Sequence, residues 1–241
     1  MQPLPYTRPL IKISGEALMG SGRHGIDAAT LAEIATDIAD VAKRSGVAVV
    51  VGGGNIFRGM SGAAHGIDRV KGDFMGMLAT VMNGLALEQA LKRLGQAVSL
   101  YSGLPVPSIC RTFSRDDAVA DLEQGAVVIL AGGTGNPFFT TDTTAALRAA
   151  ELGCDAILKA TQVDGIYSRD PKTNPRAERY DSLTFSEVLA RDLKVMDAAA
   201  IALARDNAIP IVVFSLHQKG AIGKVMRGEV RYSVVGSDPA A

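Results

Sequence analysis

Short runs of apolar residues alternate along this chain with longer segments whose apolar residues recur every three or four positions. The first pattern predicts strands buried on both faces, and the second predicts amphipathic helices. The predicted strands cover residues 10–14, 47–51, 97–101, 127–131, 156–161, 209–216 and 231–236. The predicted helices cover residues 27–46, 68–94, 114–122, 143–153, 184–191, 196–207 and 220–228. Because strands alternate with helices, we expect an α/β fold, a three-layer αβα sandwich with a largely parallel central sheet.

Three of the predicted strands end in glycine-rich turns. Strand 127–131 enters Gly-Gly-Thr-Gly before a helix, strand 10–14 carries Lys12 and ends in Ser-Gly, and strand 47–51 ends in three glycines. Free backbone N–H groups at such turns bind anions, although one helix N-terminus contributes only about 0.3–1 kcal/mol. The carboxyl ends of parallel strands converge on one crevice, so the three turns together predict a single cleft that holds anionic ligands.

The segments between these elements read as loops. Residues 15–25 hold four glycines, and residues 162–175 hold Asp-Gly and two prolines. The long helix over 68–94 has an apolar stripe, and Met75 lies off that stripe. The stripe residues are Phe74, Met77, Leu78, Val81, Met82 and Leu85. A helix that is apolar on more than one side is expected to be core or to pack against a second subunit.

Composition excludes several classes of protein. The 241 residues include 25 Lys plus Arg and 25 Asp plus Glu, and no basic run indicates nucleic acid as a partner. No apolar run is long enough to cross a membrane, and residues 1–9 lack the apolar core of a signal peptide. Cys110 and Cys154 stand apart, which favours reduced thiols and a cytoplasmic protein.

The common nucleotide-binding and hydrolase signatures are absent. The chain has no GxxxxGK[ST], no GxGxxG after its first strand, no HExxH and no GxSxG. The histidines show no metal-ligand spacing; they are His24, His65 and His217. Any phosphate chemistry is therefore expected to use a different loop architecture.

Six long motifs, in order, resemble the bacterial uridylate (UMP) kinases of the amino-acid kinase superfamily. The motifs are KISGEAL from Lys12, GGGNIFRG from Gly52, GDFMGMLATVMN from Gly72, GTGNPFFTTD from Gly133, KATQVDGIY from Lys159 and VMDAAA from Val195. The resemblance covers residues 9–236 and implies transfer of a phosphoryl group from ATP to UMP, giving UDP in pyrimidine nucleotide biosynthesis. It also implies Mg²⁺ carried by ATP rather than by protein ligands, activation by GTP, inhibition by UTP, and a homohexamer.

The resemblance also implies roles for individual residues. The catalytic residues would be Lys12, Asp142 and Asp197. The ATP-binding residues would be Lys12, Ile13, Ser14, Gly15, Gly54, Arg58, Thr161, Tyr167 and Asp170. The UMP-binding residues would be Gly53, Asp73, Thr134, Gly135, Asn136, Pro137, Phe138, Phe139, Thr140 and Thr141. The segment linked to GTP would be Gly20, Ser21, Gly22, Arg23, His24 and Gly25.

The resemblance further suggests how the chain divides. We expect a loose arm over residues 1–9 and one amino-acid kinase-like domain over 10–241, with room for an acceptor-binding lobe (10–150) and an ATP-binding lobe (151–241). The family pattern commonly has Lys where this chain has Gln162. A nucleotide contact from that side chain is therefore not carried over to this chain.

Each of these residues also has a plainer interpretation. Lys12 could be a solvated lysine at a strand end, Asp142 could be only a helix cap, and Tyr167 could be packing in a turn. Loop 20–25 could be a flexible lid. Two rival functions stay open at this point: a superfamily enzyme that phosphorylates a carboxylate or carbamate, and a nucleotide-binding sensor without turnover.

Overall fold

One mixed sheet organises the residues that the computed structural model describes, 4–57 and 66–237. Its nine strands lie in the order β4-β3-β5-β2-β1-β6-β10-β11-β9. In chain order they are β1 (Pro9–Ile13), β2 (Ala48–Val51), β3 (Val98–Ser102), β4 (Arg111–Thr112), β5 (Val127–Ala131), β6 (Ala156–Thr161), β9 (Ser182–Thr184), β10 (Ile211–Ser215) and β11 (Tyr232–Gly236). Every neighbouring pair is parallel except β10 and β11, so the expected largely parallel sheet is confirmed.

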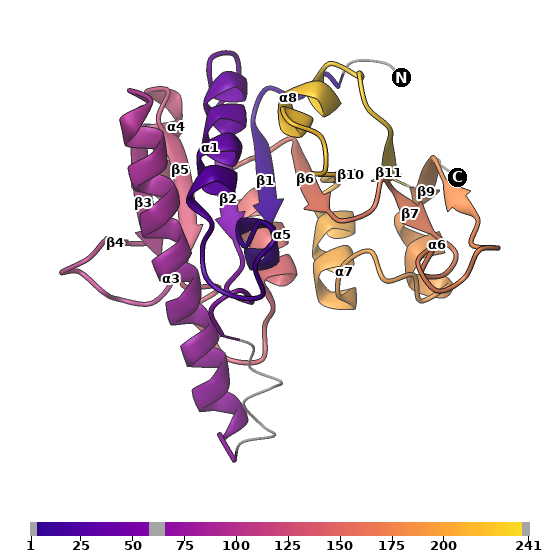
Figure 1. Ribbon diagram of the computed structural model, residues 1–241, viewed down its shortest axis with the longest axis horizontal. Helices are drawn as coiled ribbons and strands as arrows, with labels where there is room; N and C mark the ends of the chain where they lie inside the picture. Colours follow the sequence, from indigo (N-terminus) through magenta and orange to yellow (C-terminus); the bar gives the residue numbers. More distant parts are fainter. Residues whose placement is uncertain (1–3, 58–65, 238–241) are drawn as a thin grey trace.

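Helices cover both faces of this sheet (Figure 1). The helices are η1 (Gly15–Leu18, a 3₁₀ turn), α1 (Ala28–Ala42), α3 (Arg69–Arg93), α4 (Arg115–Glu123), α5 (Thr141–Glu151), α6 (Phe185–Ala190), α7 (Ala198–Asp206) and α8 (Ala221–Met226). One hydrophobic cluster joins the sheet to α1, α3 and α8, and a second joins its other face to α4, α5, α6 and α7. The predicted three-layer αβα sandwich is therefore confirmed.

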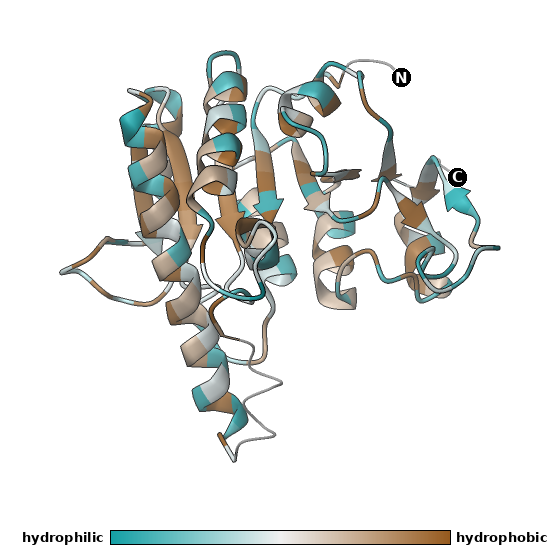
Figure 2. Ribbon diagram, viewed as in Figure 1, coloured by the Kyte–Doolittle hydropathy of each residue, from teal (hydrophilic) through white to brown (hydrophobic). Residues whose placement is uncertain are grey.

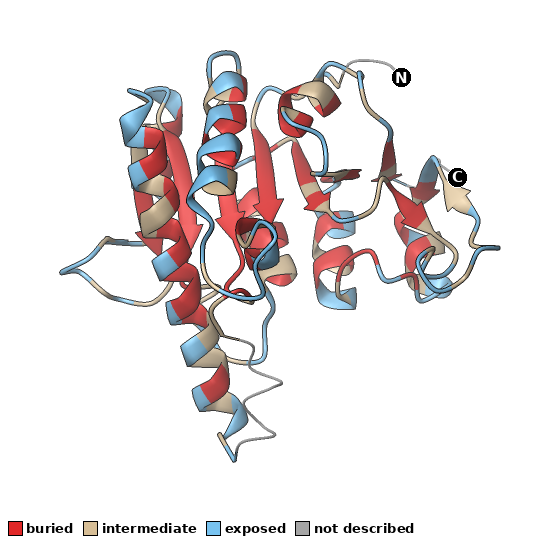
Figure 3. Ribbon diagram, in the orientation of Figure 1, coloured by how far each residue is buried: buried red, intermediate tan, exposed pale blue. Residues whose placement is uncertain are grey.

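The central strands are buried and mostly apolar. Figure 3 shows them as buried, and Figure 2 shows β2 and β5 in the hydrophobic colour, whereas β1 is partly hydrophilic because it carries Lys12. All five residues of β1 and of β5 are buried, as are all four of β2. Since both faces of these strands are covered by helices, near-continuous apolar runs are what burial requires. No helix among the described residues is long and apolar enough to cross a bilayer.

Side-chain caps set the helix starts where the sequence indicated them. The Asp27 carboxylate accepts a hydrogen bond from Thr30 N at 2.8 Å and begins α1. Ser114 begins α4, and Asp68 begins α3 through the N–H groups of residues 70 and 71. Such caps satisfy backbone donors that have no partner inside the helix.

Short elements are where the sequence interpretation was wrong. Residues 15–18, expected within a loop, form η1 and bury Leu18. The turn segment after β6 forms a two-stranded hairpin of β7 (Ile166–Tyr167) and β8 (Arg179–Tyr180). Strands β4 and β9 were also missed. Runs of two or three residues carry too little periodicity for a pattern to detect.

The N-terminal segment from Leu4 to Arg8 is hydrogen-bonded to the rest of the chain. Leu4 N donates to Met226 O at 2.8 Å, and Thr7 N donates to the Asp155 carboxylate at 2.6 Å. Arg8 N donates to the same carboxylate at 3.0 Å. These contacts fix the approach to β1. The wider division of the chain into an arm, a domain and two lobes stays a prediction.

Helix α3 buries only part of the stripe that its apolar residues predicted. Leu78 and Met82, placed in the core stripe by their spacing, are 48% and 55% exposed. Met77, Val81 and Leu87 are buried, together with Gly84. The buried face passes close to the sheet because Gly84 has no side chain: a methyl group there would lie 2.8 Å from Leu100 Cδ1 and 3.3 Å from Ala131 Cβ.

This close approach gives a matched pair of substitutions on one helix. We expect Gly84→Val to lower the free energy of unfolding by about 1–3 kcal/mol, because the added groups overpack the contact with β3 and β5. Gly76→Ala should instead be neutral or stabilising by up to about 1 kcal/mol, because an added methyl group meets nothing within 4 Å. Urea unfolding of both variants measures the difference. Equal effects of the two would contradict this account of the packing.

Candidate active site

The glycine turns after β1, β2 and β5 lie together at one edge of the sheet. Gly52 N donates to Ile13 O at 2.8 Å, which joins the first two turns directly. A methyl group on Gly15 would lie 2.9 Å from Gly52 O and 2.8 Å from Gly54 N, so only glycine permits this approach. Gly53, Gly54 and Gly133 line one cleft of about 260 Å³. The predicted convergence of the three turns is therefore confirmed.

Two lysines meet one carboxylate beside this convergence. Lys12 on β1 and Lys159 on β6 are direct partners in the parallel register, so their side chains leave the sheet side by side. Lys12 Nζ lies 2.7 Å from Asp142 Oδ1, and Lys159 Nζ lies 2.7 Å from Asp142 Oδ2. Lys159 also donates to Val195 O at 2.5 Å. Lys12 is thus a buried, fixed cation and not a solvated lysine.

The electrostatics of this Lys12–Asp142–Lys159 triad favour the charged carboxylate. Burial alone would raise the pKa of Asp142, but the ammonium groups of Lys12 and Lys159 hold it below the ordinary value of 3.8. Burial lowers the pKa of Lys159, with Asp142 opposing that shift and Lys12 adding to it. The triad carries one net positive charge, which suits a site for phosphate groups.

Asp142 is not the cap of α5, which answers one question that the sequence left open. Thr140 takes that position, and its hydroxyl accepts from the N–H groups of residues 142 and 143 at 3.0 and 3.2 Å. Asp142 stands in the first turn, where the helix dipole also favours a negative charge. The carboxylate is therefore free to orient the two lysines.

Asp197 joins the start of α5 to the start of α7. Its Oδ1 accepts from Ala200 N at 2.9 Å and so caps α7. The hydroxyls of Thr140 and Thr143 also donate to this carboxylate. A single acid thus holds the N-termini of α5 and α7 against each other beside the triad. It is a positioning group in this arrangement.

The first cleft holds part of the predicted UMP set. Residues Gly53, Asp73, Phe139, Thr140 and Thr141 line it. Asp73 is already engaged: Arg69 Nε donates to both of its oxygens at 2.9 Å, and Phe138 N donates to Oδ2 at 2.8 Å. A ligand hydroxyl at Asp73 would therefore share this carboxylate with Arg69.

The loop before Phe139 folds partly on itself. The Thr134 hydroxyl donates to Asn136 O at 3.2 Å and accepts from Asn136 N at 3.1 Å. Phe138 has a φ of 72° and is 64% exposed. Residues 134–138, Gly135 and Pro137 included, are not among those lining the first cleft.

A second cleft of about 440 Å³ opens beside Lys159. Lys159 lines it together with Thr161, Tyr167 and Asp170, which are three of the predicted ATP-binding residues. Tyr167 Oη donates to Asp164 Oδ1 at 2.6 Å, and this bond raises the pKa of the Tyr167 hydroxyl. Asp170 accepts from Lys172 N at 2.9 Å and shapes the turn that follows. Lys159 thus lines the second cleft directly, whereas the first cleft reaches the triad through Thr141, the residue before Asp142.

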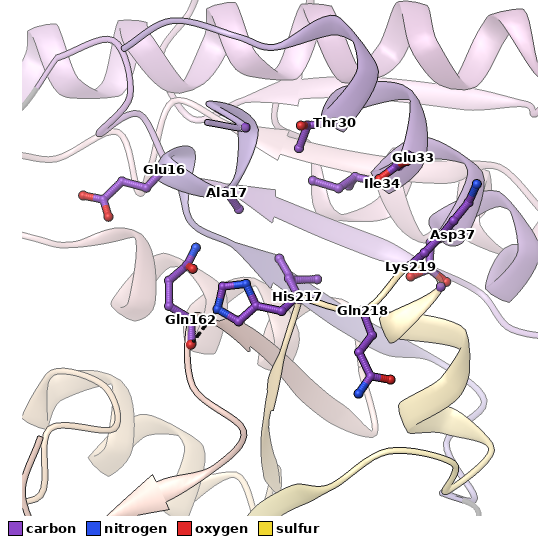
Figure 4. Close-up of a pocket in the computed structure, with 13 residues that line it drawn as sticks. Glu16, Ala17, Thr30, Glu33, Ile34, Asp37, Gln162, His217, Gln218 and Lys219 are labelled. Carbon is purple, nitrogen blue, oxygen red and sulfur yellow. Dashed lines mark hydrogen bonds between the residues drawn. The ribbon is translucent and has the colours of Figure 1, made fainter. Parts of the chain in front are cut away.

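Gln162 faces neither cleft. It lines a separate cavity of about 230 Å³, between η1 and α1 on one side and the turn before α8 on the other. Figure 4 shows a hydrogen bond between His217 Nε2 and the main-chain carbonyl oxygen of Gln162; the two atoms are 3.0 Å apart. A carbonyl can only accept, so His217 carries its proton on Nε2 in this contact. The replacement of the usual family lysine by Gln162 therefore falls beside the second cleft and not in it.

The remaining predicted residues are placed as follows. Ile13 is buried in β1, and Ser14 precedes η1 without a side-chain cap bond. Residues 21–24 of the loop linked to GTP are exposed. Arg58 lies outside the described residues.

Sequence reasoning missed Lys159, although a charged residue within the buried strand AILKAT was a usable signal.

These features define a class of protein. Buried cations held by one carboxylate, with converging glycine turns and two clefts near them, suit phosphoryl transfer, because that reaction needs mainly positioning and charge stabilisation. The fold and the site together are those of a phosphotransferase.

Comparison with known proteins narrows the class to a family. The model of the amino acid kinase family matches residues 7–215. A uridylate kinase of Bartonella henselae is 55% identical over 96% of this chain and 98% of its own. One of Agrobacterium fabrum is 58% identical over 95% and 96%. The crystal structure of UMP kinase from Ureaplasma parvum superposes with a TM-score of 0.93 at 39% identity, covering 97% of this chain and 100% of that one. The chain belongs to the amino acid kinase family, and within it to the uridylate kinases.

The triad predicts a pH-dependent contribution to stability. Because the pKa of Asp142 is lowered in the folded state, its contribution is complete well above pH 3.8 and is lost as the pH falls below that value through the folded pKa. Asp142→Asn should cost about 3–5 kcal/mol at pH 7, since it leaves two buried ammonium groups facing each other. The difference from wild type should shrink as the solution is acidified.

Urea unfolding at pH 7, 4 and 3 checks this prediction, with Asp206→Asn as the control. Asp206 is 63% exposed and pairs only with the neighbouring Arg205. Its substitution should have little effect at any of these pH values. A cost of Asp142→Asn that stays constant down to pH 3 would refute the electrostatic role of the carboxylate.

Proposed function

We propose that this protein transfers the γ-phosphoryl group of ATP to UMP, giving ADP and UDP, as a step of pyrimidine nucleotide biosynthesis. The observation that carries the proposal is that Lys159 lines the second cleft, and that Asp142, which pairs with both Lys12 and Lys159, directly follows Thr141, which lines the first. Two nucleotides bound with their phosphates toward these lysines would meet head to head. The uridylate kinases to which the chain is similar support UMP as the acceptor.

We propose that the first cleft binds UMP. Its mixture of glycine backbone, threonine hydroxyls and one carboxylate suits a nucleotide: N–H and O–H groups donate to phosphate, and Asp73 accepts from a ribose hydroxyl. Phe139 offers an apolar ring at the mouth of the cleft, where it is 53% exposed. Residues 134–138 would close over the base when it binds.

We propose that the second cleft binds ATP. Tyr167 stands on the β7–β8 hairpin, held by Asp164, and offers an aromatic ring to adenine. Asp170 and Thr161 supply acceptors for ribose hydroxyls. The phosphates would extend from this cleft past Lys159 toward Ser14, Gly15 and Gly54. Ile13 contributes backbone at that end of β1, and Arg58, also predicted to bind ATP, lies outside the described residues.

The chemistry needs no strong base. An anionic phosphate oxygen of UMP attacks the γ-phosphorus, the bond to the β-phosphate bridging oxygen breaks, and that oxygen leaves with the electron pair on ADP. Lys12 and Lys159 would stabilise the negative charge as it shifts from the attacking oxygen of UMP to the leaving oxygen of ADP. Asp142 would hold both lysines, and Asp197 would hold the two helix N-termini that border the path.

The metal is proposed to arrive with ATP. Within residues 4–57 and 66–237, no three His, Cys, Asp or Glu side chains are arranged to hold an ion. Asp142 Oδ1 is buried and lies 2.7 Å from Lys12 Nζ, so this carboxylate is engaged by the lysines and is not a free metal ligand. When bound, Mg²⁺ would neutralise phosphate charge and fix the phosphate geometry.

Further properties are proposed from the family. UTP would inhibit by competing for the first cleft, because it shares uracil and ribose with UMP. GTP would activate through the exposed loop 20–25. Both described cysteines are free, which supports the proposed cytoplasmic location. Met75, Leu78 and Met82, all at least 41% exposed, form an apolar row on α3 that supports assembly into a homohexamer.

A coupled assay with several nucleoside monophosphates at equal concentration tests the function. We expect UMP to be the best acceptor, and Lys12→Met to lower kcat by on the order of 100-fold with a smaller change in KM for UMP. Arg205→Met, an exposed cation outside both clefts, is the control. A better acceptor than UMP would overturn the substrate assignment.

The same assay separates the rival functions. An enzyme for carboxylate or carbamate acceptors would consume ATP with those compounds and not with UMP. A sensor would bind ATP and UMP in calorimetry and form no UDP. Adding GTP or UTP to the UMP reaction measures the proposed activation and inhibition directly.

The subunit arrangement has its own test. Met82→Lys would place a charge on the exposed row of α3 and should lower the mass measured by light scattering, because burying an unpaired ammonium group in an interface is costly. Thr36→Lys, on an exposed position of α1, should leave the mass unchanged. A wild-type mass of one chain would refute the hexamer.

A further inference from the structure

Two asparagine side chains face each other under the first cleft. Asn55 follows the triple glycine of β2, and Asn83 lies on α3; they are 3% and 0% exposed. Asn83 Nδ2 donates to Asn55 Oδ1 at 2.7 Å, and Asn55 Nδ2 donates to Asn83 Oδ1 at 3.1 Å. Reciprocal bonding of two buried amides fixes both side chains, since any rotation would leave polar groups unpaired.

The remaining amide protons of this Asn55–Asn83 pair reach two other segments. Asn83 Nδ2 donates to Gly52 O at 2.6 Å, which holds the glycine turn after β2. Asn55 Nδ2 donates to Gly25 O at 2.8 Å, which holds the end of loop 19–25. The pair therefore links the loop, the glycine turn and α3 through one set of hydrogen bonds.

Loop 19–25 depends on this link. Residues 21–24 are exposed, and Gly25 N also donates to Asn55 O at 2.8 Å. Within the part of the chain that the structure describes, both hydrogen bonds that tie residues 20–25 to another segment end on Asn55. A change at Asn55 therefore acts on the loop directly, and a change at Asn83 acts on it only through Asn55.

The pair also packs against the turn after β1. A methyl group on Gly15 would lie 2.4 Å from Asn55 Oδ1, so the turn after β1 packs directly on this side chain. Gly53, which lines the first cleft, packs equally closely on α3: a methyl group there would lie 2.7 Å from Gly76 O. The backbone around the proposed acceptor phosphate thus cannot shift without moving the pair.

We propose that Asn55 and Asn83 are positioning residues that couple the order of loop 19–25 to occupation of the acceptor cleft. A ligand that fixes the Gly52–Gly54 turn and α3 holds the pair, and the pair holds the loop. By thermodynamic reciprocity, anything that orders the loop also tightens binding in the cleft. The ligand-dependent part rests on the proposed function, whereas the structural link from Asn83 to the loop does not.

Hydrogen exchange of the peptide covering residues 19–26 tests the link without any ligand. Asn83→Ser should speed exchange of these amides by on the order of tenfold, although Asn83 does not touch the loop. Leu87→Ala, one turn further along α3 and fully buried, is the control: it weakens the same helix and should leave the loop unchanged at equal melting temperature. An equal response to both variants would overturn the proposal.

The wild-type protein supplies a test that needs no variant. Saturating UMP should slow exchange of residues 19–26, and Asn83→Ser should abolish that slowing and raise KM for UMP by on the order of tenfold with a smaller change in kcat. If the exchange rate of residues 19–26 in the wild-type protein is the same with and without bound UMP, the coupling is refuted. If another monophosphate proves to be the substrate, it replaces UMP as the probe, and the ligand-free comparison still decides.

Discussion

The structure is organised around two lysines held side by side by one carboxylate. Their positions follow from the register of β1 and β6, which makes Lys12 and Lys159 direct neighbours. Two like charges at about 4 Å repel by about 4 kcal/mol at an effective dielectric constant of 20. Asp142, entering between them from the first turn of α5, offsets that repulsion and leaves one net positive charge in a buried site. The strand register, the helix start and the proposed chemistry therefore depend on one another.

Close approach of backbones is the second requirement of the site. Main-chain N–H groups can gather around a phosphate only where no side chains intervene, and Gly15, Gly53 and Gly133 meet this condition. The buried amides of Asn55 and Asn83 take the place that ordered water would otherwise have, because each backbone oxygen at the turn needs a donor. Glycine gives the approach, and the asparagines make it rigid.

The placement of the two clefts follows from the sheet order. Strands β5, β2 and β1 carry the glycine turns, and β6 with the β7–β8 hairpin carries the tyrosine and its supports. Since β1 and β6 are adjacent, the boundary between the two groups falls at Lys12 and Lys159.

The sequence by itself determined the fold class, the long central elements and the glycine turns, because these depend on local periodicity and backbone preference. Residues 127–131 and 156–161 form the strands that their apolar runs indicated, and Asp27 begins the helix it was expected to cap. It did not determine which groups meet. The partners of Asp142, the importance of Lys159 and the contact of Asp73 with Phe138 N follow from contacts between segments far apart in the chain.

Tertiary structure also decided which part of the apolar stripe of α3 is buried. Gly84 lets the helix approach β3 and β5, and that approach leaves Leu78 and Met82 outside. A periodic pattern shows that a helix has an apolar side but not which neighbour will cover it. Packing between distant segments settles that choice, because only the assembled sheet shows where a side chain fits.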